Sequence, residues 1–151
     1  YTNAFLKLCF VILIELRLKI ILILIEPSKL KIMTTKELGD FGEGLALQFI
    51  RKKNYSIVTT NYRFQRNEVD LICENDQEII FIEVKTRQTA QIGPPWKAVT
   101  KQKQKQIIKC ANHYLITKDI DKNARFDIIS IVHNTSGTFI EHIENAYYPM
   151  V

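Results

Sequence analysis

The sequence has few cysteines and histidines, the residues from which disulfide frameworks and zinc sites are built. Its three cysteines are odd in number, lie far apart and lack CxxC spacing: Cys9, Cys73 and Cys110. Its three histidines lack HExxH or HxxxH spacing and are interpreted as ordinary surface or core residues: His113, His133 and His142. These absences argue against a disulfide-rich secreted domain and a zinc ribbon, and they favour a reducing compartment, the cytoplasm.

Glycine, proline and net charge are also low. The chain has 151 residues with 5 glycines, 4 prolines and 46% hydrophobic residues, the composition of one ordinary globular domain. Five basic and two acidic residues lie within residues 1–32, which leaves 16 basic and 14 acidic residues in the rest of this +5 chain. Overall basicity is therefore a weak indication of nucleic-acid binding, and the local arrangement of charges must decide.

A hydrophobic run long enough to span a membrane without a charged residue is absent as well. Residues 4–25 are dense in Leu, Ile, Phe and Val, but Glu15, Arg17 and Lys19 interrupt them. Each central charge costs about 2.5–3.5 kcal/mol against a gain of about 0.3–0.6 kcal/mol per apolar residue, so membrane insertion comes out near break-even. We expect residues 1–32 to be an extension outside the native domain, with Met33 as the start of a domain over residues 33–151. A membrane tether formed by residues 4–25 is the weaker alternative.

Alternating hydrophobic residues predict a strand pair over residues 67–87. A two-residue turn at Asn75 and Asp76, which tolerate left-handed backbone, or a four-residue turn from Glu74 to Gln77 puts Asp70 opposite Phe81. Asp70 and Glu83 then share a face as diagonal neighbours, about 7–8 Å apart at the backbone. A three-residue turn would place them on opposite faces.

Acidic side chains on largely apolar strands need compensation. Two carboxylates of like charge are costly to bury together unless a cation lies between them. A hard divalent metal is the economical candidate, with Lys85 beside it to orient or activate a water. The hairpin therefore predicts a metal-dependent site at Asp70, Glu83 and Lys85.

The rest of the chain predicts an α/β fold with a mixed central sheet of about five strands flanked by helices. The expected order is one helix, three strands, a second helix and two strands. Helical periodicity covers residues 35–53 and 100–117, and β-branched or apolar runs predict strands over residues 55–62, 126–132 and 138–143. The segment 87–95, with Gly93, Pro94 and Pro95, is expected to be a loop.

Two helical features are open to more than one interpretation. Glu43 lies on the flank of the first helix and by itself is best interpreted as a solvated glutamate, while Gly39, Gly42 and Gly44 suggest a closely packed neighbour. The second helix stacks lysines at i, i+4 and i+8, with Gln102 and Lys103 on the adjoining flank: Lys101, Lys105 and Lys109. A solvated lysine face and a ridge that contacts phosphates are equally compatible with this pattern.

Four stretches together resemble the YraN family of small bacterial proteins. They are GEGLALQFI (42–50), NYRFQRNEVDLI (61–72), FIEVKTR (81–87) and AVTKQKQKQI (98–107). That family belongs to the PD-(D/E)XK nuclease superfamily and is similar to archaeal Holliday junction resolvases. Asn67 is a departure, since the family usually has glycine there; asparagine tolerates positive φ, so the turn is expected to survive.

The resemblance implies a restriction-endonuclease-like fold and an Mg²⁺- or Mn²⁺-dependent endonuclease that acts on DNA, including branched or junction DNA, as a homodimer. The implied metal ligands are two side chains, one carbonyl and a third acid from the first helix: Asp70, Glu83, Val84 and Glu43. Lys85 would stabilise charge, and Gln102 or Lys103 would approach the scissile phosphate. The residues expected to bind nucleic acid are basic: Arg66, Arg87, Lys101, Lys103 and Lys105. A non-catalytic binding module with the same fold is the alternative.

Overall fold

A computed structural model describes residues 33–89 and 99–149. The chain divides into two units, residues 1–32 and 33–151, and the elements described here belong to the second. In order they are α2 (Thr35–Lys52), β1 (Ser56–Phe64), β2 (Asn67–Glu74), β3 (Glu78–Arg87), α3 (Lys101–Lys118), β4 (Asn123–Asn134) and β5 (Gly137–Ile143). This order confirms the predicted one. The loop predicted over 87–95 lies outside the described residues from position 90 onward.

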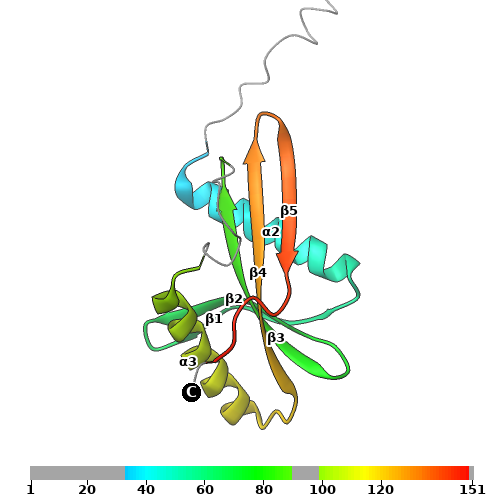
Figure 1. Cartoon of the computed structure of the whole chain (residues 1–151), viewed down its shortest axis with the longest axis vertical. Coiled ribbons are helices and arrows are strands. Elements are labelled where there is room, and N and C mark those ends of the chain that lie inside the picture. Colours follow the sequence, from blue (N-terminus) through cyan, green and yellow to red (C-terminus); the bar gives the residue numbers. More distant parts are fainter. Residues whose placement is uncertain (1–32, 90–98, 150–151) are drawn as a thin grey trace, which may run out of the picture. The chain divides into compact units, whose positions relative to one another are not determined.

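The five strands form one mixed sheet in the order β1-β2-β3-β4-β5 (Figure 1). Neighbouring strands run antiparallel except β3 and β4, which are parallel and are connected through α3. A parallel pair needs such a crossover because the chain must return to the same end of the sheet. Among the described residues, no helix is long and apolar enough to cross a membrane.

A helix packs on each face of the sheet and completes a three-layer α/β fold, as predicted. On one face α3 contributes Ile107, Cys110, Ala111 and Tyr114 to a cluster with Phe81, Phe126 and Ile128. On the other face α2 contributes Ala46 and Ile50 to a cluster with Leu71, Ile82 and Ile129. The central strand β3 is therefore buried on both sides, which agrees with its apolar sequence on both faces.

The β2–β3 hairpin differs from its prediction by two residues of register. Leu71 pairs with Ile82 and Glu74 with Ile79, so the turn residues are Asp76 and Gln77. The reason is the side chain of Asn75, whose Oδ1 accepts hydrogen bonds from the N–H groups of Gln77 and Glu78 at 2.9 and 2.7 Å. Asn75 thus closes the turn from its first position in an Asx arrangement, without left-handed backbone at Asn75 or Asp76. The parity of the register is unchanged.

The connection between β1 and β2 is a tight hairpin. Phe64 pairs with Asn67, which leaves Gln65 and Arg66 as the turn. Gln65 has φ of 56°, whereas Asn67 belongs to β2 and has no positive φ. The expectation that Asn67 uses left-handed backbone is therefore wrong, because the turn takes that conformation two residues earlier.

The alternation predicted for β2 fails at one residue. Leu71 and Cys73 face α2 as expected, but Val69 packs in the α3-side cluster with Ile72. The pairing of β2 with β3 reaches only as far as Leu71, while β2 stays paired with β1 beyond that point. The strand therefore twists away from β3 at this end, and the strict two-face pattern no longer applies.

The C-terminal segment is only partly buried. Tyr147 packs on Phe126 in the α3-side cluster, with ring centroids 5.5 Å apart. Tyr148, the next residue, is exposed. Ala146 explains the placement, because its N–H donates to the carbonyl of Phe126 and directs only one of the two rings inward.

Asp127 belongs to a buried charge network on the α2 side of the sheet. Its carboxylate accepts hydrogen bonds from the Arg125 guanidinium, from the Asn145 N–H and from His142 Nε2. Arg125 also donates to Glu78 at 2.6 Å and to the Tyr55 hydroxyl at 3.0 Å. Arg125 and Asp127 are both buried, and the polar atoms of each side chain have hydrogen-bond partners.

Gly42 explains why α2 approaches β3 closely. A Cβ at Gly42 would lie 1.7 Å from Thr86 Oγ1, whereas one at Gly39 or Gly44 would meet nothing within 4 Å. The close neighbour expected from the glycines therefore exists at one of the three. We expect Gly42→Ala to lower the free energy of unfolding by about 2 kcal/mol through overpacking.

Gly44→Ala is the matched control, since it makes the same chemical change on an exposed part of the same helix. Alanine favours a helix over glycine by up to about 1 kcal/mol, so this variant should be more stable than the parent. Urea unfolding of both variants measures the difference. Equal effects of the two substitutions would contradict the close contact with Thr86.

Candidate functional site

The candidate site lies where β2 and β3 separate. Their pairing ends at Leu71 and Ile82, and the next residues on each strand are Asp70 and Glu83. Asp70 Oδ2 accepts a hydrogen bond of 2.7 Å from the N–H of Val84. The carboxylate therefore takes a place that a strand carbonyl would otherwise fill, and it is held beside the Glu83 side chain.

Burial gives these two acids unusual proton affinities. The Glu83 side chain is 9% exposed, and burial together with the charge of Asp70 raises its pKa to about 7. Burial also raises the pKa of Asp70, against the opposing effects of the Val84 N–H and of Lys103. A pair of carboxylates with raised pKa values binds a proton near neutral pH, and for the same electrostatic reason it attracts other cations.

One lysine already lies against the pair. Lys103 Nζ is 3.1 Å from Glu83 Oε2 and donates to the carbonyl of Glu68 at 3.3 Å. The position of Lys103 is fixed by the start of α3, where the Thr100 side chain accepts a hydrogen bond from the Lys103 N–H. Glu83 Oε2 is buried and accepts no well-directed hydrogen bond despite this ion pair. Sequence reasoning placed Lys103 among the residues that contact phosphate and missed its contact with Glu83.

Glu43 approaches the site from the opposite side of the sheet. Burial and the charge of Asp70 raise the pKa of Glu43, while a hydrogen bond with the Asn61 side chain opposes them. The close contact between Gly42 and Thr86 brings this turn of α2 to the end of β3. Glu43 is thus close enough to Asp70 for their charges to interact, which a third acidic residue of the same site requires.

Most of the other predicted residues lie on the surface. Lys85 is exposed, two residues beyond Glu83 on β3, and forms no ion pair with the residues that the structure describes. Arg87 is half-buried at the end of the same strand. The remaining candidates are exposed on α3 or at the β1–β2 turn: Lys101, Gln102, Lys105 and Arg66. The structure therefore groups Asp70, Glu83 and Lys103 tightly.

The donor atoms of the pair suit a hard divalent cation. Asp70 and Glu83 present carboxylate oxygens, the ligands that Mg²⁺ and Mn²⁺ prefer, and Glu83 Oε2 is a buried acceptor without a well-directed hydrogen bond. Within residues 33–89 and 99–149, no group of three or more His, Cys, Asp or Glu side chains is arranged to hold a metal. A cation here would accordingly depend on the two carboxylates together with main-chain or water oxygens.

Comparison with known proteins places the chain in a family. Residues 42–131 match the model of the uncharacterised protein family UPF0102. The chain belongs to UPF0102. The matched residues include Glu43, Asp70, Glu83, Lys85 and the start of α3, so the whole candidate site lies within the family's shared region.

Bacterial UPF0102 proteins are similar over nearly their full length. One from Christiangramia forsetii is 44% identical over 112 residues, which cover 74% of this chain and 94% of that protein. One from Geobacter metallireducens is 42% identical over 113 residues, which cover 74% of this chain and 93% of that protein. A third, from Flavobacterium psychrophilum, is 40% identical over 112 residues.

The raised pKa of Glu83 predicts a stability effect in this UPF0102 chain. Since the ordinary value is 4.5 and the folded value about 7, the folded state binds the proton more tightly. The wild-type chain therefore loses stability as pH rises from about 4.5 through 7. Without metal at pH 8, Glu83→Gln should raise the free energy of unfolding by about 2–3 kcal/mol.

Urea unfolding in EDTA at pH 8 and at pH 5 measures this difference, which should largely disappear at the lower pH. Glu141→Gln, at an exposed position of β5, makes the same change of charge and should alter stability by less than about 0.5 kcal/mol. A Glu83→Gln protein less stable than wild type at pH 8 would show that the pair with Lys103 outweighs burial and repulsion.

Proposed function

We propose that this chain is a metal-dependent endonuclease that hydrolyses phosphodiester bonds in DNA. The observation that carries the proposal is a pair of carboxylates at the open end of β2 and β3, the buried Glu83 and the half-buried Asp70. Burying two acids together lowers stability, so a protein gains from the arrangement only if the pair binds a cation or a proton. The resemblance of the surrounding sequence to PD-(D/E)XK nucleases favours the cation.

Each residue of the site has a distinct task in this proposal. Asp70 and Glu83 would hold the metal together with the Val84 carbonyl, and Glu43 would support them from α2. When bound, Mg²⁺ or Mn²⁺ supplies a polarised phosphate oxygen and a water of lowered pKa. Lys85 neutralises the negative charge that develops on the phosphate in the transition state. Its exposed position leaves the ammonium free to meet a substrate from solvent.

Lys103 has a second task besides its pairing with Glu83. Its ammonium contacts a carboxylate and a carbonyl, and both are acceptors that a metal would also attract. Lys103 therefore supplies the positive charge beside Glu83, and from this position its ammonium would also be available to a bound phosphate. Gln102, on the adjacent exposed position, can donate hydrogen bonds to the same phosphate.

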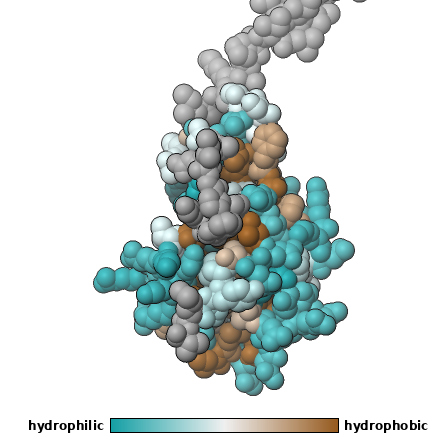
Figure 2. Space-filling view, in the orientation of Figure 1, coloured by the Kyte–Doolittle hydropathy of each residue, from teal (hydrophilic) through white to brown (hydrophobic). Residues whose placement is uncertain are grey.

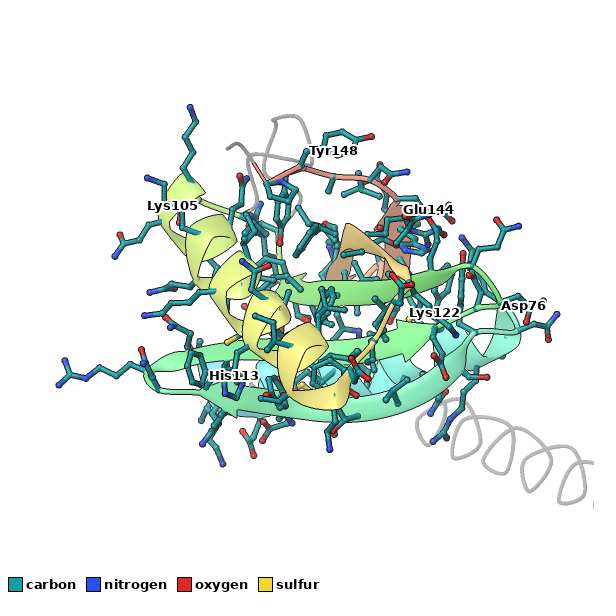
Figure 3. The ribbon with its side chains drawn as sticks, turned by 90° about the horizontal axis from the view of Figure 1, so that it is seen from below. Asp76, Lys105, His113, Lys122, Glu144 and Tyr148 are labelled. Carbon is teal, nitrogen blue, oxygen red and sulfur yellow. The ribbon has the colours of Figure 1, made fainter. Side chains whose placement is uncertain are left out.

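The surface around the site suits a polyanion. Exposed lysines line the first turns of α3, and Figure 3 shows Lys105 extending away from the sheet. Arg66 at the β1–β2 turn and Arg87 at the end of β3 add positive charge. Contacts of this kind position a phosphate backbone and do not read sequence, so structure-selective cutting fits better than sequence-specific cutting.

A cleavage assay tests the proposal. The full-length chain is incubated with labelled linear, flapped and four-way DNA in Mg²⁺ or Mn²⁺, alongside Asp70→Asn. We expect cleavage by the parent, with branched DNA preferred, and a rate at least about 100-fold lower for the variant. Circular dichroism and urea midpoints control for folding. A folded Asp70→Asn protein that cuts at the parental rate would exclude this site.

The alternative function is nucleic-acid binding without hydrolysis. It would require that the chain bind DNA in a salt-sensitive manner while calorimetry detects no Mn²⁺ binding. Retention of Glu43, Asp70, Glu83 and Lys85 in one chain favours the enzyme, because a binding module needs none of these acids. Calorimetry on the parent and on Asp70→Asn separates the two functions.

A further inference from the structure

Two phenylalanine or tyrosine side chains are exposed among the described residues. Phe139 on β5 is 61% exposed, and Tyr148 in the C-terminal segment is 69% exposed. Exposed rings of this size contribute little to the core, and they attract partners that offer another flat surface. Figure 2 shows hydrophobic atoms among hydrophilic ones around the upper ends of β4 and β5.

Both rings lie on the side of the sheet that carries the candidate site. Along β5, Ile143 packs in the α3-side cluster and Ile140 in the α2-side cluster, so Phe139 shares the face of Ile143. Glu83 shares that face too, because it lies two residues beyond Phe81 on β3 and Phe81 packs in the α3-side cluster. Tyr148 follows Tyr147, which packs in the α3-side cluster, and Figure 3 shows Tyr148 and Lys105 both in the upper part of the view.

The strand register places Phe139 within reach of a substrate bound near Lys85. Lys85 lies beside Ser130, and Ser130 lies beside Glu141 on β5. Phe139 is two residues beyond Glu141. With strands about 4.8 Å apart and a rise of about 3.3 Å per residue, Lys85 and Phe139 are about 12 Å apart at the backbone. That separation equals between three and four steps of about 3.4 Å in stacked DNA.

We propose that Phe139 and Tyr148 stack against unpaired bases of a nucleic acid bound at this face. The inference rests on the proposed function, because it takes nucleic acid as the ligand. Aromatic side chains beside cationic ones are the combination that binds single strands without sequence preference. Unpaired bases offer their flat faces, whereas the stacked bases of a duplex do not. The two rings therefore give the site its preference for branched or single-stranded segments.

The neighbours of Phe139 argue against a protein as the intended partner. Phe139 itself pairs with the half-buried Val132, which pairs in turn with Arg87, and the adjoining row on the same face consists of Lys85, Ser130 and Glu141. A protein interface would extend the apolar surface around its central ring. A single exposed ring with one apolar neighbour, Val132, and charged side chains beyond it fits a base, which stacks on the ring while its phosphate meets the cations.

Binding measurements without metal test this inference. The full-length chain in EDTA is titrated into fluorescein-labelled oligothymidylate of about 15 nucleotides, into oligouridylate of the same length, and into a duplex of the same length. Phe139→Ala and Tyr148→Ala should each weaken binding to the single strands by about 5- to 100-fold. Binding to the duplex should change less than about twofold.

Three further variants sharpen the result. Phe139→Trp should bind single strands as tightly as the parent, while Phe139→Leu, equally apolar but not aromatic, should behave as Phe139→Ala does. Val58→Ala removes an exposed apolar side chain from β1, at the other edge of the sheet, and should have no effect. A stronger effect on one of the two single strands would show which sugar the face prefers and would still support stacking.

The inference is overturned if single-strand and duplex binding weaken equally, if neither variant weakens single-strand binding, or if Phe139→Leu binds as the parent does. Its failure can be separated from that of the proposed function. A chain that cuts DNA but shows unchanged binding in Phe139→Ala rejects only the stacking role. A chain that never cuts, yet loses single-strand affinity in both variants, rejects only hydrolysis.

Discussion

Lys85→Ala should reduce cleavage by at least about 100-fold and leave the stability of the fold unchanged. The reasons are its exposure and its place on β3, two residues from the buried Glu83. An ammonium that has no ionic partner within the described residues contributes little to folding, since exposed lysines generally change stability by less than about 0.5 kcal/mol. Loss of the Lys85 ammonium should therefore lower the cleavage rate without changing the free energy of unfolding.

Single-turnover cleavage with saturating Mg²⁺, together with urea midpoints, measures the two quantities. Lys118→Ala is the matched control, because Lys118 is also exposed but lies at the far end of α3. It should cut within about twofold of the parent, the change expected for a small free-energy difference. Undiminished cutting by Lys85→Ala would exclude the assigned role, and a lowered urea midpoint would show that Lys85 has a structural partner.

Asp127→Asn should lower the free energy of unfolding by about 3–5 kcal/mol at pH 7. The substitution keeps the size of the side chain but leaves the buried Arg125 guanidinium without its fully buried negative partner. It also weakens the acceptor that serves His142 and the Asn145 N–H. Several buried donors lose their partner at once, which is among the most costly single changes in a core.

The pH dependence of this effect has a definite sign. Burial by itself raises the pKa of Asp127, but hydrogen bonds from His142 and Arg125 outweigh burial and leave the pKa below its ordinary value of 3.8. The stabilisation by the charged carboxylate is therefore complete above the ordinary value and is lost as pH falls through the folded value. Urea unfolding of wild type and Asp127→Asn should converge in acid.

Glu144→Gln provides the control for charge at the edge of the same network. The Glu144 side chain is 44% exposed and pairs with Lys53 at 2.9 Å. An exposed pair contributes at most about 1 kcal/mol, so this variant should unfold close to the parent. Loss of more than about 2 kcal/mol in Glu144→Gln would mean that the exposed rim, and not the buried pair, holds the network together.

Much of the fold could be predicted because local patterns determine it. Thr100 as the cap of α3 and the apolar residues of β3 follow from capping chemistry and from burial on both sides of the sheet. The shared face of Asp70 and Glu83 followed from the parity of a hairpin alone. Parity survives a two-residue error in register, so the shared face of the two acids followed from the sequence, whereas the prediction that Asp70 lies opposite Phe81 was wrong, because Phe81 pairs with Ile72.

What could not be predicted depends on contacts between distant residues. The turn prediction failed because it ignored that one side chain, Asn75, can close the turn from its first position. The contact of Lys103 with Glu83 depends on how α3 crosses the sheet, and a lysine-rich helix start contains no sign of it. The Arg125 network likewise joins residues up to 70 positions apart, which no local pattern reveals.

The separation along the chain also bears on the order in which the site assembles. Asp70 and the Val84 N–H are only 14 positions apart, whereas Lys103 reaches Glu68 across 35 and Arg125 reaches Tyr55 across 70. Closing the shortest of these loops costs about 1.4 kcal/mol less chain entropy than closing the longest. We therefore expect the two acids to meet early in folding, within one hairpin, before the helix that carries Lys103 docks. Docking of α3 then adds the Lys103 ammonium, which offsets the negative charge of Glu83.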